Sequence, residues 1–466
     1  MKIKKMFGNW SFYKTLILIA LPIVLQQVIS QFVNLLDNLM VGQLGTADID
    51  AVSIANQFIF IFNLAIFGAI SGPSIFATQY HGNNDIDGIK KCIRYKLLIC
   101  MIIMVIAIII FLLFDEQLFN LFIHIDEDNT VDPIVVIKNG HDYLMIMLFG
   151  LLPFVITEIY SSNLREAKQT VIPMVASLIA VFINILLNYC LILGHLGFPR
   201  LGVKGAAIAT IISRYVSCIF IVVYSHVKGK KYLFMKSLYK KILPDSLFTK
   251  TVFKKTYILL VNETLWALGM TLVNQCYSLK GLEVVAACNI VSTFTNLFSL
   301  VGTSLGNATA ILLGQKLGAS KDEEALEDSY KFLSSSFIIG VLVALLMILL
   351  RTLVPSLYNT TEKVITLSEN LIILSAIITP IRILSTCSYF IIRCGGKVYI
   401  TFLFDSVFTL FIRVPIAFIL AKFTHLDIYM IYFIAEITEI VKVIIGIILV
   451  KKGIWVHNVT KELATD

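Results

Sequence analysis

The chain is dominated by long apolar runs that are separated by short polar segments. A helix needs about 20 mostly apolar residues to cross about 30 Å of hydrocarbon, and many of these runs reach that length. Because lipid offers no hydrogen-bond partner to a bare backbone, each run is predicted to be a transmembrane helix. The sequence predicts twelve spans, at about residues 15–40, 50–76, 97–114, 143–163, 171–194, 205–226, 256–279, 284–313, 332–350, 370–392, 399–421 and 428–450.

The composition excludes a water-soluble fold. Of the 466 residues 58% are apolar and only 15% are charged, whereas soluble domains carry about 25% charged residues. A soluble protein cannot hide that much apolar surface, so soluble enzymes and nucleic-acid-binding proteins are excluded. The net charge of +8 does not indicate a nucleic-acid partner, because the basic residues lie between the apolar runs.

The distribution of basic residues predicts how the chain is oriented in the membrane. If the N-terminus is cytoplasmic, most Lys and Arg fall in the inside segments, and residues 227–255 alone hold nine lysines and one acid. The loop after the third span has the opposite character, since its acids come before any Lys or Arg. The positive-inside rule therefore predicts cytoplasmic termini and a multi-pass protein of the cell membrane, which is the inner membrane in a bacterium.

An internal repeat relates the two halves of the chain. With a shift of 236 residues, Ala51–Ile54 meets Ala287–Ile290 and Gln79–Gly82 meets Gln315–Gly318. Each half holds six spans, so the sequence predicts an all-α membrane protein with two pseudo-symmetric six-helix lobes. The predicted lobes are residues 1–226 and 256–466, joined by a basic cytoplasmic linker at 227–255. Parallel repeats of this kind are a plan of secondary transporters, which bind substrate between the halves.

Polar side chains recur at helical spacing on several spans. One interpretation is hydrogen bonding between helices, worth about 0.6 kcal/mol for each bond. Because several spans share the pattern, we favour a polar cavity for a small-molecule substrate. The candidate cavity residues are Gln27, Gln31 and Asn34 on the first span, Asn56 and Asn63 on the second, and Asn296 on the eighth.

Asp37 is the most informative residue of the first span. A carboxylate inside a span costs at least about 2.5 kcal/mol on insertion scales and is by default a functional hypothesis. Candidate partners at similar depth are Asn184 and Asn188, spaced i,i+4 on the fifth span, and Thr210 on the sixth. One carboxylate, amide oxygens and a hydroxyl suit Na⁺, or a carboxyl that takes up a proton. The alternative is that Asp37 marks a wet helix end before Gly42.

Further charges lie inside the C-terminal spans. Glu263 corresponds to Gln27 under the 236-residue shift, so it also faces the predicted polar interior. Arg382 on the tenth span is a candidate partner for Glu263 and a further candidate cavity residue. Glu439 and Lys442 are spaced i,i+3 and can neutralise each other.

Motifs of enzyme chemistry are missing from the sequence. There is no His-Glu-x-x-His, no P-loop and no dinucleotide-binding glycine pattern. We therefore expect no catalytic residues and no cofactor, and an ATP-driven pump in this chain alone is not expected.

Several segments together resemble the multidrug and toxic compound extrusion (MATE) family of cation-coupled antiporters. The resemblance covers nearly the whole chain, with twelve spans, two six-span lobes and a central cytoplasmic linker. The segments that carry it are Leu21–Val24 through Asp37–Gly42, Asn184–Tyr189, Gly202–Thr210, and Arg393 with Lys397.

The resemblance implies a coupling site and a substrate class. It implies that H⁺ or Na⁺ binds at Asp37, with help from Asn184, Asn188 and Thr210. Glu263 matches a seventh-span Glu that one branch uses in coupling, whereas Arg382 stands where that branch has an Asp. This departure puts a second cation site in the C-terminal lobe in doubt. The resemblance also implies export of amphipathic, often cationic compounds.

The sequence thus predicts a monomeric secondary active exporter in the lipid bilayer that uses H⁺ or Na⁺ and is not an enzyme. The second interpretation is a flippase for an anionic lipid-linked sugar, which Arg382 and Arg413 motivate. The third is a membrane-embedded transferase or hydrolase, which would require paired acids or a metal cluster at one membrane face.

Overall fold

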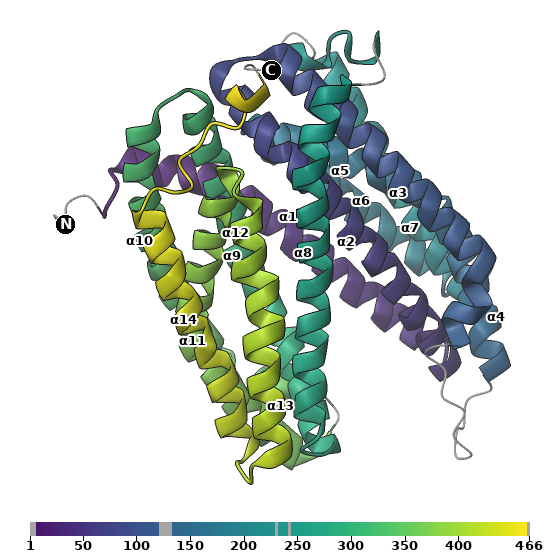
Figure 1. Ribbon diagram of the computed structural model, residues 1–466. Coiled ribbons are helices and arrows are strands. Elements are labelled where there is room, and N and C mark those ends of the chain that lie inside the picture. Colours follow the sequence, from purple (N-terminus) through teal and green to yellow (C-terminus); the bar gives the residue numbers. More distant parts are fainter. Residues whose placement is uncertain (1–5, 121–132, 229–231, 241–243, 359, 464–466) are drawn as a thin grey trace. The chain divides into compact units, whose positions relative to one another are not determined.

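The computed structural model describes residues 6–120, 133–228, 232–240, 244–358 and 360–463, and every regular element of this part is helical (Figure 1). The longer helices are α1 (Trp10–Gly42), α2 (Thr46–Asn83), α3 (Ile86–Asn120), α4 (Pro133–Leu148), α5 (Leu151–Glu166), α6 (Val171–Leu191), α7 (Val203–Val227), α8 (Ser246–Ser278), α9 (Leu282–Gly318), α10 (Asp322–Leu349), α11 (Glu362–Cys394), α12 (Val398–Phe402), α13 (Val414–Phe423) and α14 (Ile428–Lys451). Short helical turns are η2 (Leu233–Met235), η3 (Leu238–Lys240), η4 (Pro355–Leu357), η5 (Leu403–Val407), η6 (Thr409–Arg413) and η7 (Lys461–Leu463). Much of the predicted acidic loop lies at 121–132, outside the described residues.

The helices account for the predicted spans. Within the described residues ten helical segments are long and apolar enough to cross a membrane, and the bent pair α4–α5 adds an eleventh. The helix α14 is also long enough, with 24 residues, and is set apart from these segments by the charged residues Glu436, Glu439 and Lys442. The prediction of an all-α, multi-pass membrane protein is therefore confirmed.

Two of the predicted spans are irregular. The fourth span is broken, because α4 and α5 meet at an angle of 50°. At the break the Gly150 carbonyl accepts a hydrogen bond from Arg214 Nη1 at 3.3 Å, which supplies a partner to a backbone group near the bend. The eleventh span, Val398–Phe423, contains the two π-helical turns η5 and η6. Such turns are rare and occur frequently at functional sites.

The chain divides into two compact units. Unit 1 comprises Met1–Val24, Thr78–Asp85 and Thr251–Asp466, and unit 2 comprises Leu25–Ala77 and Ile86–Lys250. The first part of α1 and the end of α2 thus belong with the C-terminal helices, although the sequence repeat assigns both to the N-terminal lobe. The helix α1 changes unit at Val24, two residues after Pro22, which lies inside the helix.

The predicted linker at 227–255 is partly helical. Its last ten residues belong to α8, which begins at Ser246. Residues 229–231 and 241–243 of this segment lie outside the described part, and η2 and η3 lie between them.

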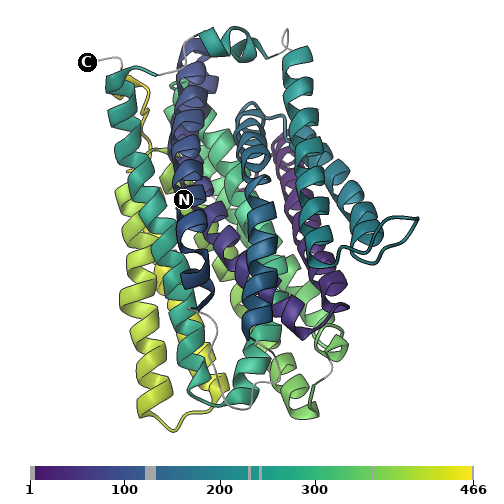
Figure 2. The same ribbon diagram turned by 90° about the vertical axis from the view of Figure 1, so that its right-hand side faces the viewer.

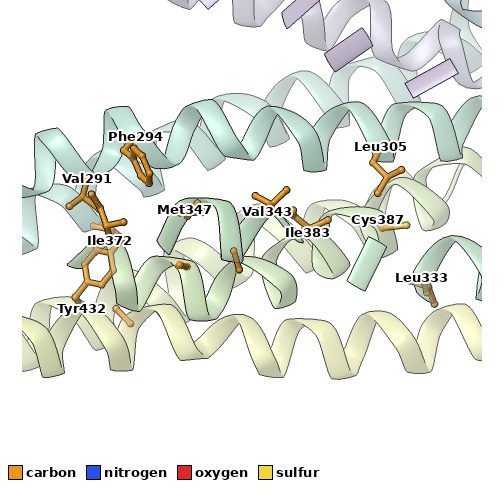
Figure 3. Packing of buried hydrophobic residues seen from close by; sticks show 14 of the residues in the cluster. Val291, Phe294, Leu305, Leu333, Val343, Met347, Ile372, Ile383, Cys387 and Tyr432 are labelled. Carbon is orange, nitrogen blue, oxygen red and sulfur yellow. The ribbon is translucent and has the colours of Figure 1, made fainter. Parts of the chain in front are cut away.

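Unit 1 has a continuous apolar core. The helices α9, α10, α11 and α14 lie side by side, as Figure 1 and Figure 2 show, and α11 contacts the other three. Phe294 of α9, Met347 of α10 and Ile372 of α11 are buried in one cluster (Figure 3). The start of α14 is fixed by a local contact: the Asp427 side chain accepts a hydrogen bond from Met430 N at 2.9 Å and so caps the helix.

Candidate functional site

The structure brings Asp37 together with its three predicted partners inside unit 2. Asn188 Nδ2 donates a hydrogen bond to Asp37 Oδ1, and it also donates to Asn184 Oδ1 at 3.1 Å. Asn184 Nδ2 in turn donates to Thr210 Oγ1 at 3.3 Å. Asn184 and Asn188 are buried, while Asp37 and Thr210 are half-buried. A single hydrogen-bonded chain therefore links α1, α6 and α7.

A close approach of two helices places the two asparagines beside Thr210. A Cβ atom added at Gly205 on α7 would lie 2.5 Å from the Leu191 carbonyl oxygen at the end of α6. Only glycine permits this contact, because a real Cβ does not come so close to a backbone oxygen. The i,i+4 spacing then keeps Asn184 and Asn188 on one face of α6, toward Thr210.

The oxygens of this cluster fit the predicted coupling ion. Asn188 Oδ1 is buried and has no hydrogen-bond partner among the described residues. A carboxylate, an amide oxygen and a hydroxyl are hard ligands of the kind that alkali and alkaline-earth cations prefer. The carboxyl of Asp37 offers a site for a proton in the same place. The cluster can therefore accept a small cation without a change of residues.

Two neighbours of Asp37 were missed by sequence reasoning. Arg214 and Tyr143 both interact electrostatically with Asp37. Arg214 also lies over the ring of Phe154, with 5.2 Å from its guanidinium carbon to the ring centroid. The signal for Arg214 was available, because it stands four residues after Thr210 on the same helix. The signal for Tyr143 was not, since its position depends on how α4 packs.

The predicted cavity residues of unit 2 differ in their surroundings. Asn56 accepts a hydrogen bond from Tyr143 OH at 3.4 Å, which places it near the Asp37 cluster. Asn63 Oδ1 is buried without a hydrogen-bond partner in the described part. Gln27 is half-buried and Gln31 is exposed, whereas the side chain of Asn34 lies outside the described residues.

The predicted partner of Glu263 in unit 1 was wrong. Glu263 forms an ion pair of 3.6 Å with Arg393, and Tyr389 OH donates a hydrogen bond to it at 3.5 Å. Arg382 instead forms an ion pair and a hydrogen bond with Glu436 on α14. The sequence could not decide between these partners because the contact depends on the rotation of α11. Asn296, the remaining cavity candidate, is exposed.

Six charged side chains of unit 1 form an alternating chain that the sequence did not reveal. Glu436 binds both Arg382 and Arg413, and Arg413 also lies 3.6 Å from Glu439. Lys442 lies 3.9 Å from Glu439, as the i,i+3 spacing predicts, but its closer partner is Asp405 at 2.7 Å. The π-helical turns η5 and η6 carry Asp405 and Arg413, so they orient two members of the chain. The three positive and three negative charges balance.

A buried ion pair in unit 2 was also missed. Lys96 is fully buried and forms an ion pair of 2.6 Å with Glu166. It also donates to Ser162 Oγ at 3.0 Å and to Asn163 Oδ1 at 2.9 Å. Lys96 lies on α3 and its three partners lie on α5, so these contacts join the two helices.

Comparisons with known proteins agree with the fold and the repeat. The family model MatE matches residues 22–190 and 258–419. The chain is similar to a probable multidrug resistance protein NorM of Photorhabdus laumondii, with 27% identity over 72% of this chain and 73% of that protein. It is also similar to the probable multidrug resistance protein YoeA of Bacillus subtilis, with 25% identity over 90% and 89% of the two chains.

Solved structures show the same fold. One is the outward-facing conformation of a multidrug resistance MATE family transporter of the MOP superfamily, with TM-score 0.83, 18% identity, and 97% of this chain and 99% of that chain covered. Another is the Vibrio cholerae MATE transporter VcmN, with TM-score 0.85, 16% identity, and 96% and 98% covered. The predicted two-lobe fold class is confirmed.

Proposed function

Because the chain belongs to the MatE family, whose members are transporters and not enzymes, we propose that it is a secondary active exporter driven by H⁺ or Na⁺. The observation that carries the proposal is the hydrogen-bonded chain from Asp37 through Asn188 and Asn184 to Thr210. It supports a site where one small cation binds within the membrane-spanning part of the protein.

The ion drives transport by changing the charge of a carboxylate inside a span. A proton on Asp37, or a Na⁺ among the oxygens of the cluster, neutralises that charge and changes the free energy of the conformation that holds it. The ion biases the equilibrium only as far as its affinity differs between the two conformations. Pro22, in the first half of α1, supports a bend in that helix, because proline leaves one backbone carbonyl without its hydrogen-bond donor.

We propose amphipathic, often cationic compounds as cargo, loaded from the cytoplasm. Relatives named as multidrug resistance proteins support this substrate class. The positive-inside distribution supports cytoplasmic termini, and the bacterial relatives support the inner membrane. We propose that one chain in the lipid bilayer acts as a monomer.

The competing interpretations receive less support. Arg382 and Arg413, which motivated an anionic lipid-linked sugar, both bind Glu436, and Arg413 also pairs with Glu439, so carboxylates of the protein already offset their charges. A transferase or hydrolase would need a cluster of acids or metal ligands. Among the described residues no three His, Cys, Asp or Glu side chains gather in this way.

The test replaces the carboxylate and imposes the gradients separately. Efflux of a cationic dye is measured in inverted vesicles under a proton gradient and under a sodium gradient. We expect one of the two gradients to drive export by the wild type. Asp37→Asn should lower this driven rate at least about 100-fold, because the asparagine side chain can neither ionise nor take up a proton. Asp50→Asn, which changes an exposed carboxylate at the start of α2, is the matched control. Undiminished driven efflux in Asp37→Asn would refute the coupling role.

A further inference from the structure

Arg214 is a positive charge within a spanning helix of unit 2 that the proposed function does not yet use. It lies near the middle of α7, four residues after Thr210. Six further cations on the spanning helices form ion pairs with acids, namely Lys96, Arg165, Arg382, Arg393, Arg413 and Lys442. Arg214 forms no ion pair with an acid in the described part of the chain. A charged side chain inside a span is costly, so an arginine without an ion pair is a functional hypothesis.

Uncharged groups hold the guanidinium of Arg214. Nη1 donates a hydrogen bond to the Gly150 carbonyl at 3.3 Å, and the guanidinium carbon lies 5.2 Å from the ring centroid of Phe154. A Cβ added at Gly150 would lie 3.5 Å from Arg214 Cδ, so the side chain passes close to the break between α4 and α5. A carbonyl and an aromatic ring attract a cation without removing its net charge. Arg214 is therefore a full positive charge held in a fixed place.

The charge of Arg214 acts on Asp37. The two groups interact electrostatically, and each of them also interacts with Tyr143. Thr210, one helical turn before Arg214, belongs to the hydrogen-bonded chain that reaches Asp37. All these residues belong to unit 2. The carboxylate of Asp37 accepts its hydrogen bond from Asn188. Arg214 thus offsets part of the charge of Asp37 without binding its oxygens.

A fixed positive charge weakens the binding of any cation near it. Two unit charges several ångströms apart inside a protein repel each other strongly enough to change an affinity about tenfold or more. A proton and Na⁺ carry the same charge, so the effect has the same sign for both. An ion that is bound and released in every cycle must be held firmly enough to enter and weakly enough to leave. The charge of Arg214 acts on the second of these requirements.

We propose that Arg214 sets the affinity of the coupling site, because its fixed charge keeps the binding of a cation at Asp37 weak enough for the ion to leave within each cycle. The inference rests on the proposed export function. Arg214 acts through Asp37 and is therefore a positioning residue. The same charge also lowers the cost of an ionised Asp37 in the span once the ion has left.

Replacement of Arg214 separates its charge from its packing. Arg214→Gln removes the charge and keeps an amide that can donate to the Gly150 carbonyl. We expect the ion concentration for half-maximal efflux to fall about tenfold. The maximal rate should fall as well, because a more tightly bound ion leaves more slowly. Arg214→Lys keeps the charge and should retain nearly the wild-type concentration. Arg200→Gln, which removes an exposed arginine of unit 2, is the matched control and should change neither value.

The direction of the change distinguishes the proposal from a structural role. If Arg214 only supported the bend between α4 and α5, its loss would disturb the Asp37 cluster and raise the half-maximal concentration. A raised or unchanged concentration in Arg214→Gln overturns the proposal. An equal fall in Arg214→Lys overturns it too, because that variant retains the positive charge.

A cysteine at position 37 reports the effect of Arg214 without ion or cargo. In Asp37→Cys, the rates of reaction with a cationic and an anionic thiosulfonate of similar size are compared, and their ratio cancels the fraction of thiolate. All eight native cysteines are buried, and the wild type gives the background rate. Adding Arg214→Gln should raise the ratio of cationic to anionic rates at least about tenfold. Adding Arg200→Gln should not change it.

The outcomes of the cysteine test separate this inference from the proposed function. An unchanged ratio in the Arg214→Gln background overturns the role of Arg214. So does a failure of both reagents to react, because charged solutes would then not reach position 37. A raised ratio in a protein whose efflux neither gradient drives would support the charge effect and refute the export function.

Discussion

At the residue scale, Asp37 is distinguished from the other acids of the helices by its partner. Glu166, Glu263 and Glu436 each form an ion pair with a Lys or Arg, and so does Asp405. Asp37 accepts a hydrogen bond from the neutral amide of Asn188. Arg214 also interacts electrostatically with Asp37, but the direct partner of the carboxylate is a neutral amide, so we expect Asp37 to be the acid best suited to exchange an ion.

Removal of the Asn188 amide should weaken ion binding. Asn188→Ala takes away the donor to Asp37 and one buried oxygen, and a hydrogen bond to a charged group contributes about 1.5–3 kcal/mol. We expect the ion concentration for half-maximal efflux to rise about tenfold or more. Efflux as a function of ion concentration measures it. Asn139→Ala removes an equivalent Asn–Asp bond, to Asp48 over 2.7 Å, and should leave that concentration unchanged.

The bridging acid of the charge chain should matter for stability. Glu436 is buried between Arg382 and Arg413, so Glu436→Gln leaves the buried Arg413 and the half-buried Arg382 without their shared carboxylate. Breaking a buried pair costs about 3–5 kcal/mol in the free energy of unfolding. Thermal unfolding in detergent measures the change, and the exposed Glu323→Gln serves as control. A wild-type melting temperature in Glu436→Gln would contradict this account of the chain.

At the element scale, the site depends on how closely α6 and α7 approach. The residues that bind one another are 26 positions apart in sequence, and the Gly205–Leu191 contact brings their helices together. The bend between α4 and α5 also contributes, because Arg214 binds the Gly150 carbonyl there. The positions of Thr210 and Arg214 are therefore set by helix packing.

A methyl group at the helix contact should disturb the site from a distance. Gly205→Ala places a Cβ 2.5 Å from the Leu191 oxygen, so the two helices must move apart. We expect a loss of about 1–3 kcal/mol in the free energy of unfolding, together with weaker ion binding in the efflux assay. Gly42→Ala, whose nearest neighbour would be a flexible Ile49 carbon at 3.6 Å, should behave like the wild type. Unaltered ion binding in Gly205→Ala would show that the contact does not position the cluster.

At the scale of the whole molecule, the division into units does not follow the sequence repeat. Part of α1 and the end of α2 belong with the C-terminal helices. Both helices therefore change unit along their length. The change lies between Val24 and Leu25 in α1 and between Ala77 and Thr78 in α2. The helix α8 also changes unit, between Lys250 and Thr251.

The C-terminal segment Trp455–Leu463 should keep its contacts with α8 over the physiological pH range. Burial alone would raise the pKa of the Glu462 carboxyl, but the hydrogen bond with His457 and the charge of Lys255 hold it below its usual value of 4.5. A lowered pKa stabilises the folded protein above the unfolded pKa, and this contribution is lost as the pH falls through the folded pKa.

Fluorescence of Trp455, which is fully buried, measures this pH dependence. With Trp10→Phe and Trp266→Phe, Trp455 is the single tryptophan of the three in the chain. We expect its emission to stay constant between about pH 8 and 6 and to shift to the red only in acid, below the ordinary Glu pKa of about 4.3. Glu462→Gln should remove the acid transition. A transition near neutral pH that Glu462→Gln abolishes would contradict the lowered pKa.

The sequence predicted the Asp37 cluster well and the other contacts poorly. Asp37, Asn188 and Asn184 could be grouped because helical spacing and depth in the membrane limit which polar side chains can meet. The partner of Glu263 could not be found in this way, because Arg382 and Arg393 both lie on α11 and only its rotation selects one. The π-helical turns that carry Asp405 and Arg413 also left no pattern in the sequence.

The sequence by itself determined that the chain is helical and crosses a membrane, that its halves repeat, and that the first span carries an acid with two asparagines at similar depth on the fifth. These properties follow from the free energy of placing apolar and charged groups in lipid, which each segment sets locally. Only the tertiary structure decided which cation neutralises which acid, where α1 and α2 change unit, and that the tail returns to bind Gln79. Those contacts join residues far apart in sequence, so they depend on the packing of helices and not on any local pattern.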